Sequence, residues 1–146
     1  MQAQIKLENI DPVTCVVKAT HTAKGRTNSV SPGATASRNL FYGRIRLEAG
    51  DEPITFENGT HETGLVCLNG SGSVTTGGQT FSLSRYDAVY VPRDSKIITS
   101  SEGDFDLAEF SSPVEKQYPL QFISFSEIRE DPALHFTAGK PPTERD

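Results

Sequence analysis

The sequence contains no tryptophan, one methionine and only two cysteines among its 146 residues. The spacing of Cys15 and Cys67 matches no metal-binding motif, and a chain of this length can bury a sufficient core without disulfides or a structural metal. Cys67 lies in an apolar run, residues 65–68. We therefore expect Cys67 to be a buried thiol that packs as a small hydrophobic side chain.

Long apolar runs and clusters of basic residues are also missing. No segment approaches the roughly 20 apolar residues of a membrane-spanning helix, and the first residues, MQAQIKLENIDP, lack the basic start and apolar core of a signal peptide. The formal net charge is -5 and the lysines and arginines are scattered, which argues against nucleic-acid binding. We expect a cytoplasmic protein that binds neither nucleic acid nor a membrane.

The sequence does contain many short apolar runs, separated by Gly, Pro, Asn, Asp and Ser. Runs of this length and spacing predict an all-β protein, and we expect a single antiparallel β-barrel, or jelly-roll sandwich, with at most one or two short helices. The pair Gly77-Gly78 is a strong signal for a two-residue hairpin. The expected strands are residues 5–7, 13–19, 40–47, 54–57, 62–68, 73–76, 79–83, 87–91, 97–101 and 105–110.

Three segments depart from the strand pattern. Residues 24–38 are rich in Ser, Thr and Gly and predict a long loop. Residues 126–130 can form a short helix that begins at Ser126 as its N-cap. Residues 129–146 are rich in Pro and charge and predict an extended tail or linker, which leaves residues 1–128 as the β domain.

Residues 62–96 read ETGLVCLNGSGSVTTGGQTFSLSRYDAVYVPRDSK. This stretch resembles the N-terminal cupin half of 5-keto-4-deoxyuronate isomerase and the related 5-deoxy-glucuronate isomerase, and a looser match by strand order runs over residues 40–128. The resemblance implies a cupin-like β domain and a role in carbohydrate catabolism. The motifs that carry it are Glu62-Thr63-Gly64, Gly70-Ser71-Gly72, the Gly77-Gly78 hairpin and residues 85–92, RYDAVYVP.

Members of this family are bicupins, and the resemblance implies a metal held in their C-terminal half by three histidines and one glutamate. A metal cupin supplies His-x-His and Glu on one strand pair and a further His from a later strand. Here His21 and His135 lie outside the core strands, and His61 adjoins Glu62, so that the two side chains point to opposite faces of a regular strand. A bulge at residues 59–60 can change that geometry. We expect neither a protein-held metal nor another cofactor.

Glu62 shares a strand face with apolar residues such as Val66. A carboxylate on such a face needs a partner or has a raised pKa. We predict that Glu62 and His61 supply acid/base catalysis. Two alternatives stay open: Glu62 can pair with an arginine such as Arg44 at the barrel mouth, and His61 can be a surface residue after a turn.

Polar side chains near the strand ends are candidates for substrate contact. Arg44 and Arg46 share one strand face and can bind a carboxylate bidentately, although they can equally form a solvated face. Glu109 alternates with Phe105 and Leu107 and has the same ambiguity as Glu62. Tyr90, Arg93 and Lys96 surround the end of a core strand. The alternative to substrate contact is that these side chains simply lie on the surface. The predicted substrate-binding residues are Arg44, Tyr90, Arg93, Lys96 and Glu109.

Two functions follow from these observations. The first is a uronate or deoxysugar isomerase-like cupin that binds a small sugar acid or a related carbohydrate and acts by proton transfer. The second is a metal-free, non-catalytic cupin module for sugar binding, oligomerisation or pairing with a separate catalytic subunit. In either case we expect a homodimer or another homo-oligomer, because closed symmetric assemblies are the common form.

Overall fold

The computed structural model describes residues 12–135, and in this range the chain forms ten β-strands, one 3-10 turn and one short α-helix. The predicted all-β class is therefore confirmed. The elements are η1 (Pro12–Cys15), β1 (Gly25–Val30), β2 (Phe41–Leu47), β3 (Ile54–Glu57), β4 (His61–Gly70), β5 (Gly72–Thr76), β6 (Gln79–Leu83), β7 (Ala88–Val91), β8 (Lys96–Ser100), β9 (Phe105–Pro113), β10 (Gln121–Ile123) and α1 (Phe125–Glu130).

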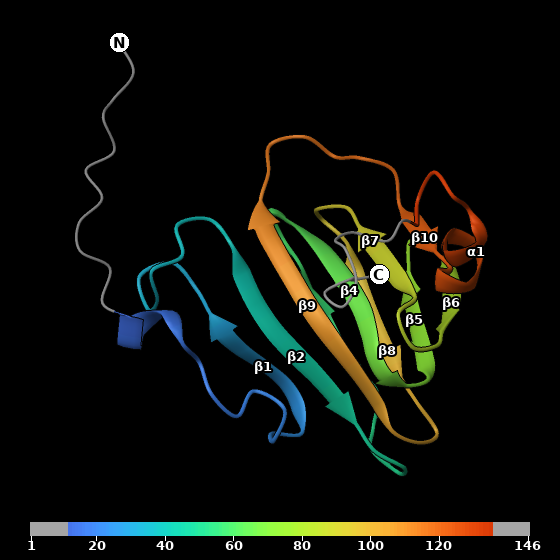
Figure 1. The fold of residues 1–146 in the computed structure, drawn as a ribbon, viewed down its shortest axis with the longest axis horizontal. Helices are drawn as coiled ribbons and strands as arrows, with labels where there is room; N and C mark the ends of the chain where they lie inside the picture. Colours follow the sequence, from blue (N-terminus) through green and yellow to red (C-terminus); the bar gives the residue numbers. More distant parts are fainter. Residues whose placement is uncertain (1–11, 136–146) are drawn as a thin grey trace, which may run out of the picture.

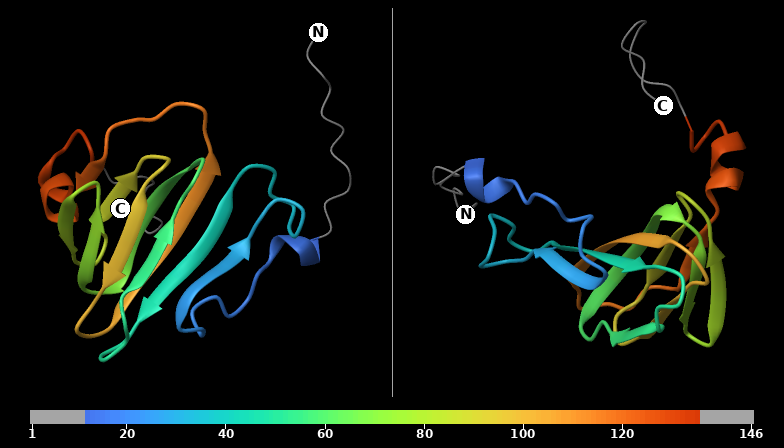
Figure 2. Two further views of the ribbon diagram at one scale, coloured as in Figure 1. Left: turned by 180° about the vertical axis from the view of Figure 1, so that it is seen from behind. Right: turned by 90° about the horizontal axis from the view of Figure 1, so that it is seen from below.

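The strands form two antiparallel sheets that pack as a sandwich (Figures 1 and 2). The larger sheet has six strands in the order β1-β2-β9-β4-β7-β10, and the smaller has four in the order β3-β8-β5-β6. Figure 1 shows β1 at one edge of the larger sheet and β10, followed by α1, at the other. Neither helical segment of the described chain has the length and apolar character needed to cross a bilayer.

Alternating side chains from both sheets fill the space between them. In β2, Gly43, Ile45 and Leu47 are buried, which confirms the predicted inner face of that strand. In β4 the inner face is formed by Thr63, Leu65 and Cys67, so Glu62 and Val66 lie on the outer face, contrary to the prediction. The reason is that residues 65–68 are apolar on both faces, so the pattern did not specify which one is buried. The buried apolar cluster comprises Ile45, Leu47, Leu65, Cys67, Val74, Leu83, Val89, Val91, Ile97, Phe105 and Leu107.

The Gly77-Gly78 hairpin is confirmed. Thr76 of β5 pairs with Gln79 of β6, and both glycines have positive φ angles, 56° and 74°. This is the backbone geometry that the favoured two-residue hairpin turn requires.

The predictions for the N-terminal part need correction. The segment 24–38 is not one long loop, because residues 25–30 form strand β1, which pairs with β2. The sequence of this strand, GRTNSV, is mostly polar. It therefore lacks the alternation of apolar and polar residues by which a strand is recognised. The strand expected at residues 13–19 is also absent: a 3-10 turn ends at Cys15 and no regular element follows it there. The strand expected at residues 5–7 lies outside the described residues.

The C-terminal part is nearer to expectation. The predicted short helix exists, but it begins at Phe125 with Ser124 in the N-cap position, in place of Ser126. The three-residue strand β10 was not predicted. The Asp87 carboxylate accepts backbone N–H groups from Ser84 and Phe125, both at 2.8 Å, and so ties the start of α1 to the core. The helix extends to Glu130, inside the predicted tail, and residues 136–146 of that tail lie outside the described range.

Gly43 controls how closely β1 approaches β2. A Cβ atom at this position would lie 2.1 Å from the carbonyl oxygen of Thr27, which belongs to the backbone of β1. Only glycine permits this approach, which occurs next to the register shift between Asn28 and Val30. The position of β1 therefore depends on a missing side chain in its neighbour.

We predict that Gly43→Ala destabilises the protein by about 1 to 3 kcal/mol, because the added methyl group overpacks a rigid backbone contact. This corresponds to a Tm lower by roughly 3 to 10 °C in a thermal unfolding experiment. Gly64→Ala is the matched control, since a Cβ there meets nothing within 4 Å, and its effect should stay within about 0.5 kcal/mol. Equal losses for both variants would contradict the assignment.

We also predict that the two cysteines differ in reactivity. Burial raises the pKa of the Cys67 thiol to about 11, so at pH 8 only about one molecule in a thousand carries the reactive thiolate. Cys15 is exposed. Titration of the folded protein with Ellman's reagent at pH 8 should release one equivalent quickly and the second only in denaturant. The Cys15→Ser variant should show no fast reaction, and a fast reaction in that variant would count against a buried Cys67.

Candidate functional site

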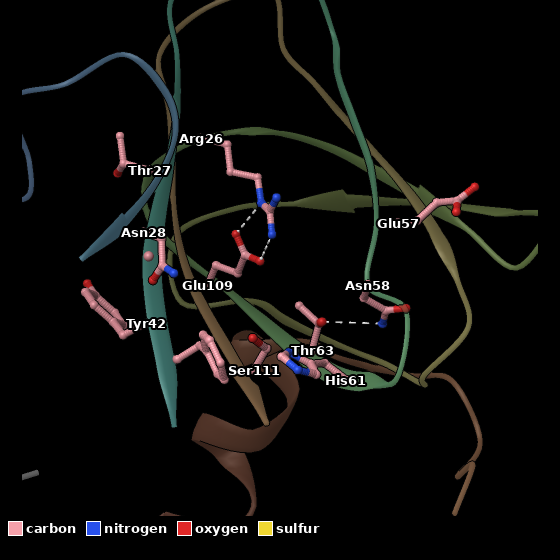
Figure 3. Close-up of a pocket in the computed structure, with 12 residues that line it drawn as sticks. Arg26, Thr27, Asn28, Tyr42, Glu57, Asn58, His61, Thr63, Glu109 and Ser111 are labelled. Carbon is pink, nitrogen blue, oxygen red and sulfur yellow. Dashed lines mark hydrogen bonds and ion pairs between the residues drawn. The ribbon is translucent and has the colours of Figure 1, made fainter. Parts of the chain in front are cut away.

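A pocket of about 290 Å³ opens between the sheets at the end of the sandwich where β1 and β2 face the turn after β3 (Figure 3). Its walls come from the inner faces of β1, β2, β4 and β9 and from residues Glu57 and Asn58. The buried apolar cluster fills the rest of the space between the two sheets. The polar side chains that matter for its chemistry are Arg26, Asn28, His61, Thr63, Glu109 and Ser111.

An ion pair between Arg26 and Glu109 forms one wall of the pocket. The guanidinium donates from Nε to Oε2 at 2.8 Å and from Nη2 to Oε1 at 2.7 Å. The Glu109 side chain is only 7% exposed, whereas that of Arg26 is 41% exposed. The guanidinium also lies over the ring of Phe56, 3.9 Å from its centroid. Arg26 is therefore held by two contacts, and part of its side chain stays exposed and lines the pocket.

His61 is the first residue of β4, and its half-buried side chain lies on the same inner face as Thr63. The ring packs against Phe41 of β2, with the two centroids 4.8 Å apart. Across the ladder, Thr63 pairs with Ser111 of β9, which brings two hydroxyl groups beside the imidazole (Figure 3). The site thus places one titratable imidazole next to neutral hydrogen-bonding groups.

Asn58 fixes the turn that leads into His61. Its Nδ2 donates to the carbonyl oxygen of Pro92 at 2.8 Å, and its Oδ1 accepts from the backbone N–H of Ser95 at 2.8 Å. Both contacts reach the β7–β8 connection in a different part of the chain. The amide therefore has a structural role: it ties the turn before β4 to the connection that runs from β7 to β8.

The donor set of this pocket does not fit the metal centre of a metal cupin. It supplies one imidazole, and its buried carboxylate, Glu109, is bonded to a guanidinium. Within residues 12–135, no three His, Cys, Asp or Glu side chains lie together in a way that could hold an ion.

Glu62, one of the two predicted catalytic residues, lies on the outer face of the larger sheet and does not line the pocket. Its partner is Tyr90, whose hydroxyl donates to Oε2 at 2.9 Å. Burial, together with this hydrogen bond, raises the pKa of Tyr90 to about 12, so the phenol stays protonated at neutral pH. The geometry separates Glu62 from His61, because adjacent strand residues face opposite sides.

The other predicted residues divide between pocket and surface. Arg44 pairs with Asp106 on the outer face, and this carboxylate raises the pKa of Arg44. Arg93 donates to the carbonyl oxygen of Val114 at 2.6 Å, and this bond fixes the segment that follows β9. Lys96 is exposed at the start of β8. Of all the predicted site residues, only His61 and Glu109 line the pocket.

Arg26 was missed because it fell in the segment predicted to be a loop. The available signal was its spacing from Asn28: residues two apart lie on one face of a strand. Both residues line the pocket, but polar alternation alone does not distinguish a strand from a loop.

Comparison with known proteins identifies the relatives of this chain. An IolB-like protein from Salmonella typhimurium LT2 matches with a TM-score of 0.64 and 26% identity, over 73% of this chain and 44% of its own. EutQ from Clostridium difficile (TM-score 0.50, 14% identity, 62% of each chain) and the Cnp3 cupin domain from Schizosaccharomyces pombe (0.50, 16%, 61% of this chain and 64% of its own) share the fold. No curated protein matches the chain.

The chain therefore spans less than half the length of the IolB-like protein. The model of the KduI/IolB family matches residues 15–133, which include every strand of the sandwich and the whole pocket. With its cupin-type sandwich and this match, the chain belongs to the KduI/IolB family.

Proposed function

We propose that this protein is a cupin of carbohydrate catabolism that binds a small sugar acid or a related carbohydrate in the pocket and isomerises it by proton transfer. Membership of the KduI/IolB family supports the carbohydrate class. The observation that carries the proposal is the position of His61, a titratable side chain inside a polar pocket of ligand-binding size.

Aldose–ketose isomerisation moves one proton between neighbouring carbons. A base removes the proton from the carbon that bears a hydroxyl group next to the carbonyl, and an enediolate forms. The conjugate acid returns a proton to the former carbonyl carbon, while the hydroxyl proton passes to the other oxygen. An imidazole can take both roles near neutral pH, and His61 is the pocket residue suited to them.

The surroundings of His61 favour this role. Phe41 packs against the ring and limits its orientations, and the hydroxyl groups of Thr63 and Ser111 lie nearby to hold substrate oxygens (Figure 3). In the described residues no side chain donates to or accepts from the imidazole nitrogens. His61 lines the pocket, so these nitrogens are its candidates for contact with a bound sugar.

A second candidate is a non-catalytic module that binds a sugar and pairs with a catalytic subunit. It is favoured by the state of the carboxylates: Glu109 is bonded to Arg26, and Glu62 lies outside the pocket. The remaining carboxylate of the pocket, Glu57, points away from His61 (Figure 3), so no free carboxylate lies beside the imidazole for proton transfer. Formation of a homodimer stays a prediction for either function.

We predict that His61→Asn lowers the turnover of 5-keto-4-deoxyuronate or 5-deoxy-glucuronate by about 100- to 10,000-fold, the usual contribution of general acid–base catalysis. KM should change little, because asparagine keeps a polar group of similar reach. Steady-state kinetics of the purified protein checks both values. The control is His21→Asn, at an exposed position outside the pocket, which should keep full turnover.

Two results would decide against this assignment. Undiminished turnover in His61→Asn would remove the imidazole from the mechanism. A wild-type protein that binds these sugars in calorimetry without converting them would establish the second candidate instead.

A further inference from the structure

The Arg26–Glu109 pair has hydrogen-bonding capacity left over. Two guanidinium N–H groups, on Nε and Nη2, are used by Glu109. A guanidinium has five N–H groups, so three remain, two of them on Nη1. Each carboxylate oxygen of Glu109 accepts one of these bonds and retains a second lone pair. The pair therefore presents donors and acceptors side by side at the pocket wall (Figure 3).

The charge of this pair is balanced, which limits what it can attract. A ligand carboxylate that approaches Arg26 also approaches Glu109, whose oxygens lie within 2.8 Å of the guanidinium nitrogens. The repulsion by Glu109 then offsets part of the attraction by Arg26, so the pair attracts an acid group less than an unpaired arginine would. A further carboxylate, Glu57 of β3, lines the pocket from the other sheet. The arginine and glutamate side chains of the pocket thus offer no net positive charge to an acid group.

A hydroxyl group gains from both members of the pair. It accepts a hydrogen bond from a guanidinium N–H and donates one to a carboxylate oxygen, and hydrogen bonds to ionised groups are the stronger kind. Two neighbouring hydroxyl groups of a sugar can use the pair together. The bidentate geometry and the contact with Phe56 hold the guanidinium in place. The Arg26 side chain therefore loses little conformational entropy when a ligand binds.

We infer that Arg26 and Glu109 recognise neighbouring hydroxyl groups of the ligand and do not recognise its carboxylate. This inference rests on the proposed function in one respect, the use of this pocket for a carbohydrate. It goes beyond it by assigning the part of the sugar that the pair binds. In this arrangement the acid group of a sugar acid lies toward the open mouth of the pocket and is hydrated by water.

The test compares two open-chain ligands that differ only at C1, D-glucitol and D-gluconate, by calorimetry at pH 7. Wild-type protein should bind both, with dissociation constants within about threefold of each other, because the balanced pair contributes little to acid recognition. Glu130→Gln, on the exposed part of α1, serves as the control and should leave both constants unchanged.

Two variants unbalance the pair in opposite directions. Glu109→Gln removes the negative charge, and its gluconate binding should become at least about tenfold tighter than its glucitol binding. Arg26→Met leaves the carboxylate alone, and gluconate should then bind at least about tenfold more weakly than glucitol. A thermal unfolding scan identifies a variant that has not folded, and the other variant then carries the test.

The inference is overturned if wild-type protein prefers gluconate by tenfold or more and Arg26→Met abolishes that preference. It is also overturned if the folded variants leave the ratio of the two constants unchanged, or if wild-type protein binds neither ligand. Failure of catalysis is a separate outcome: a protein without isomerase turnover that shows these binding ratios retains the inference and loses only the proposed chemistry.

Discussion

The candidate site depends on how closely β1 lies against β2. Gly43 has no side chain where any other residue would collide with the backbone of Thr27, and this absence lets β1 complete the wall of the pocket. Arg26 then reaches across β2 to Glu109 on β9, the next strand of the sheet. Without this approach the pocket would be bounded by β2, and the carboxylate inside it would have no cation.

Because Glu109 needs a cation beside it, the Arg26–Glu109 pair is structurally important as well as a candidate for binding. An ionised carboxylate buried to the extent of Glu109 is costly unless it is paired and hydrogen-bonded. Arg26 provides two directional bonds and keeps part of its surface accessible. The same contact therefore satisfies a buried charge and leaves polar groups facing the pocket, and removal of either partner affects the other.

Much of the fold could be predicted from the sequence. The glycine pair at 77–78 and the alternation of Gly43, Ile45 and Leu47 led to the correct hairpin and the correct inner face of β2. The site was harder to predict. Strand β4 is apolar on both faces, so its inner face was assigned wrongly, and Glu62 lies outside the pocket that His61 lines.

Strand β1 illustrates the other limit. Its inward residues, Arg26 and Asn28, are polar because they face a pocket and not the core. Hydrophobic periodicity finds strands that bury apolar side chains, and it is silent where a strand lines a site. The residues most relevant to binding were thus the ones with the weakest structural signal, whereas the buried Glu109 was found because apolar neighbours frame it.

The edge position of β1 has a consequence for motion. Within the described range this strand is bonded to β2 alone, and the apolar cluster of the sandwich includes none of its residues. Peripheral elements with few buried apolar contacts open at lower free energy than the whole domain. A ligand that bridges Arg26 and Glu109 would join this edge to the sheet interior, so that occupancy and local order of β1 rise together. Amide protons of β1 are where such coupling would be visible by hydrogen exchange.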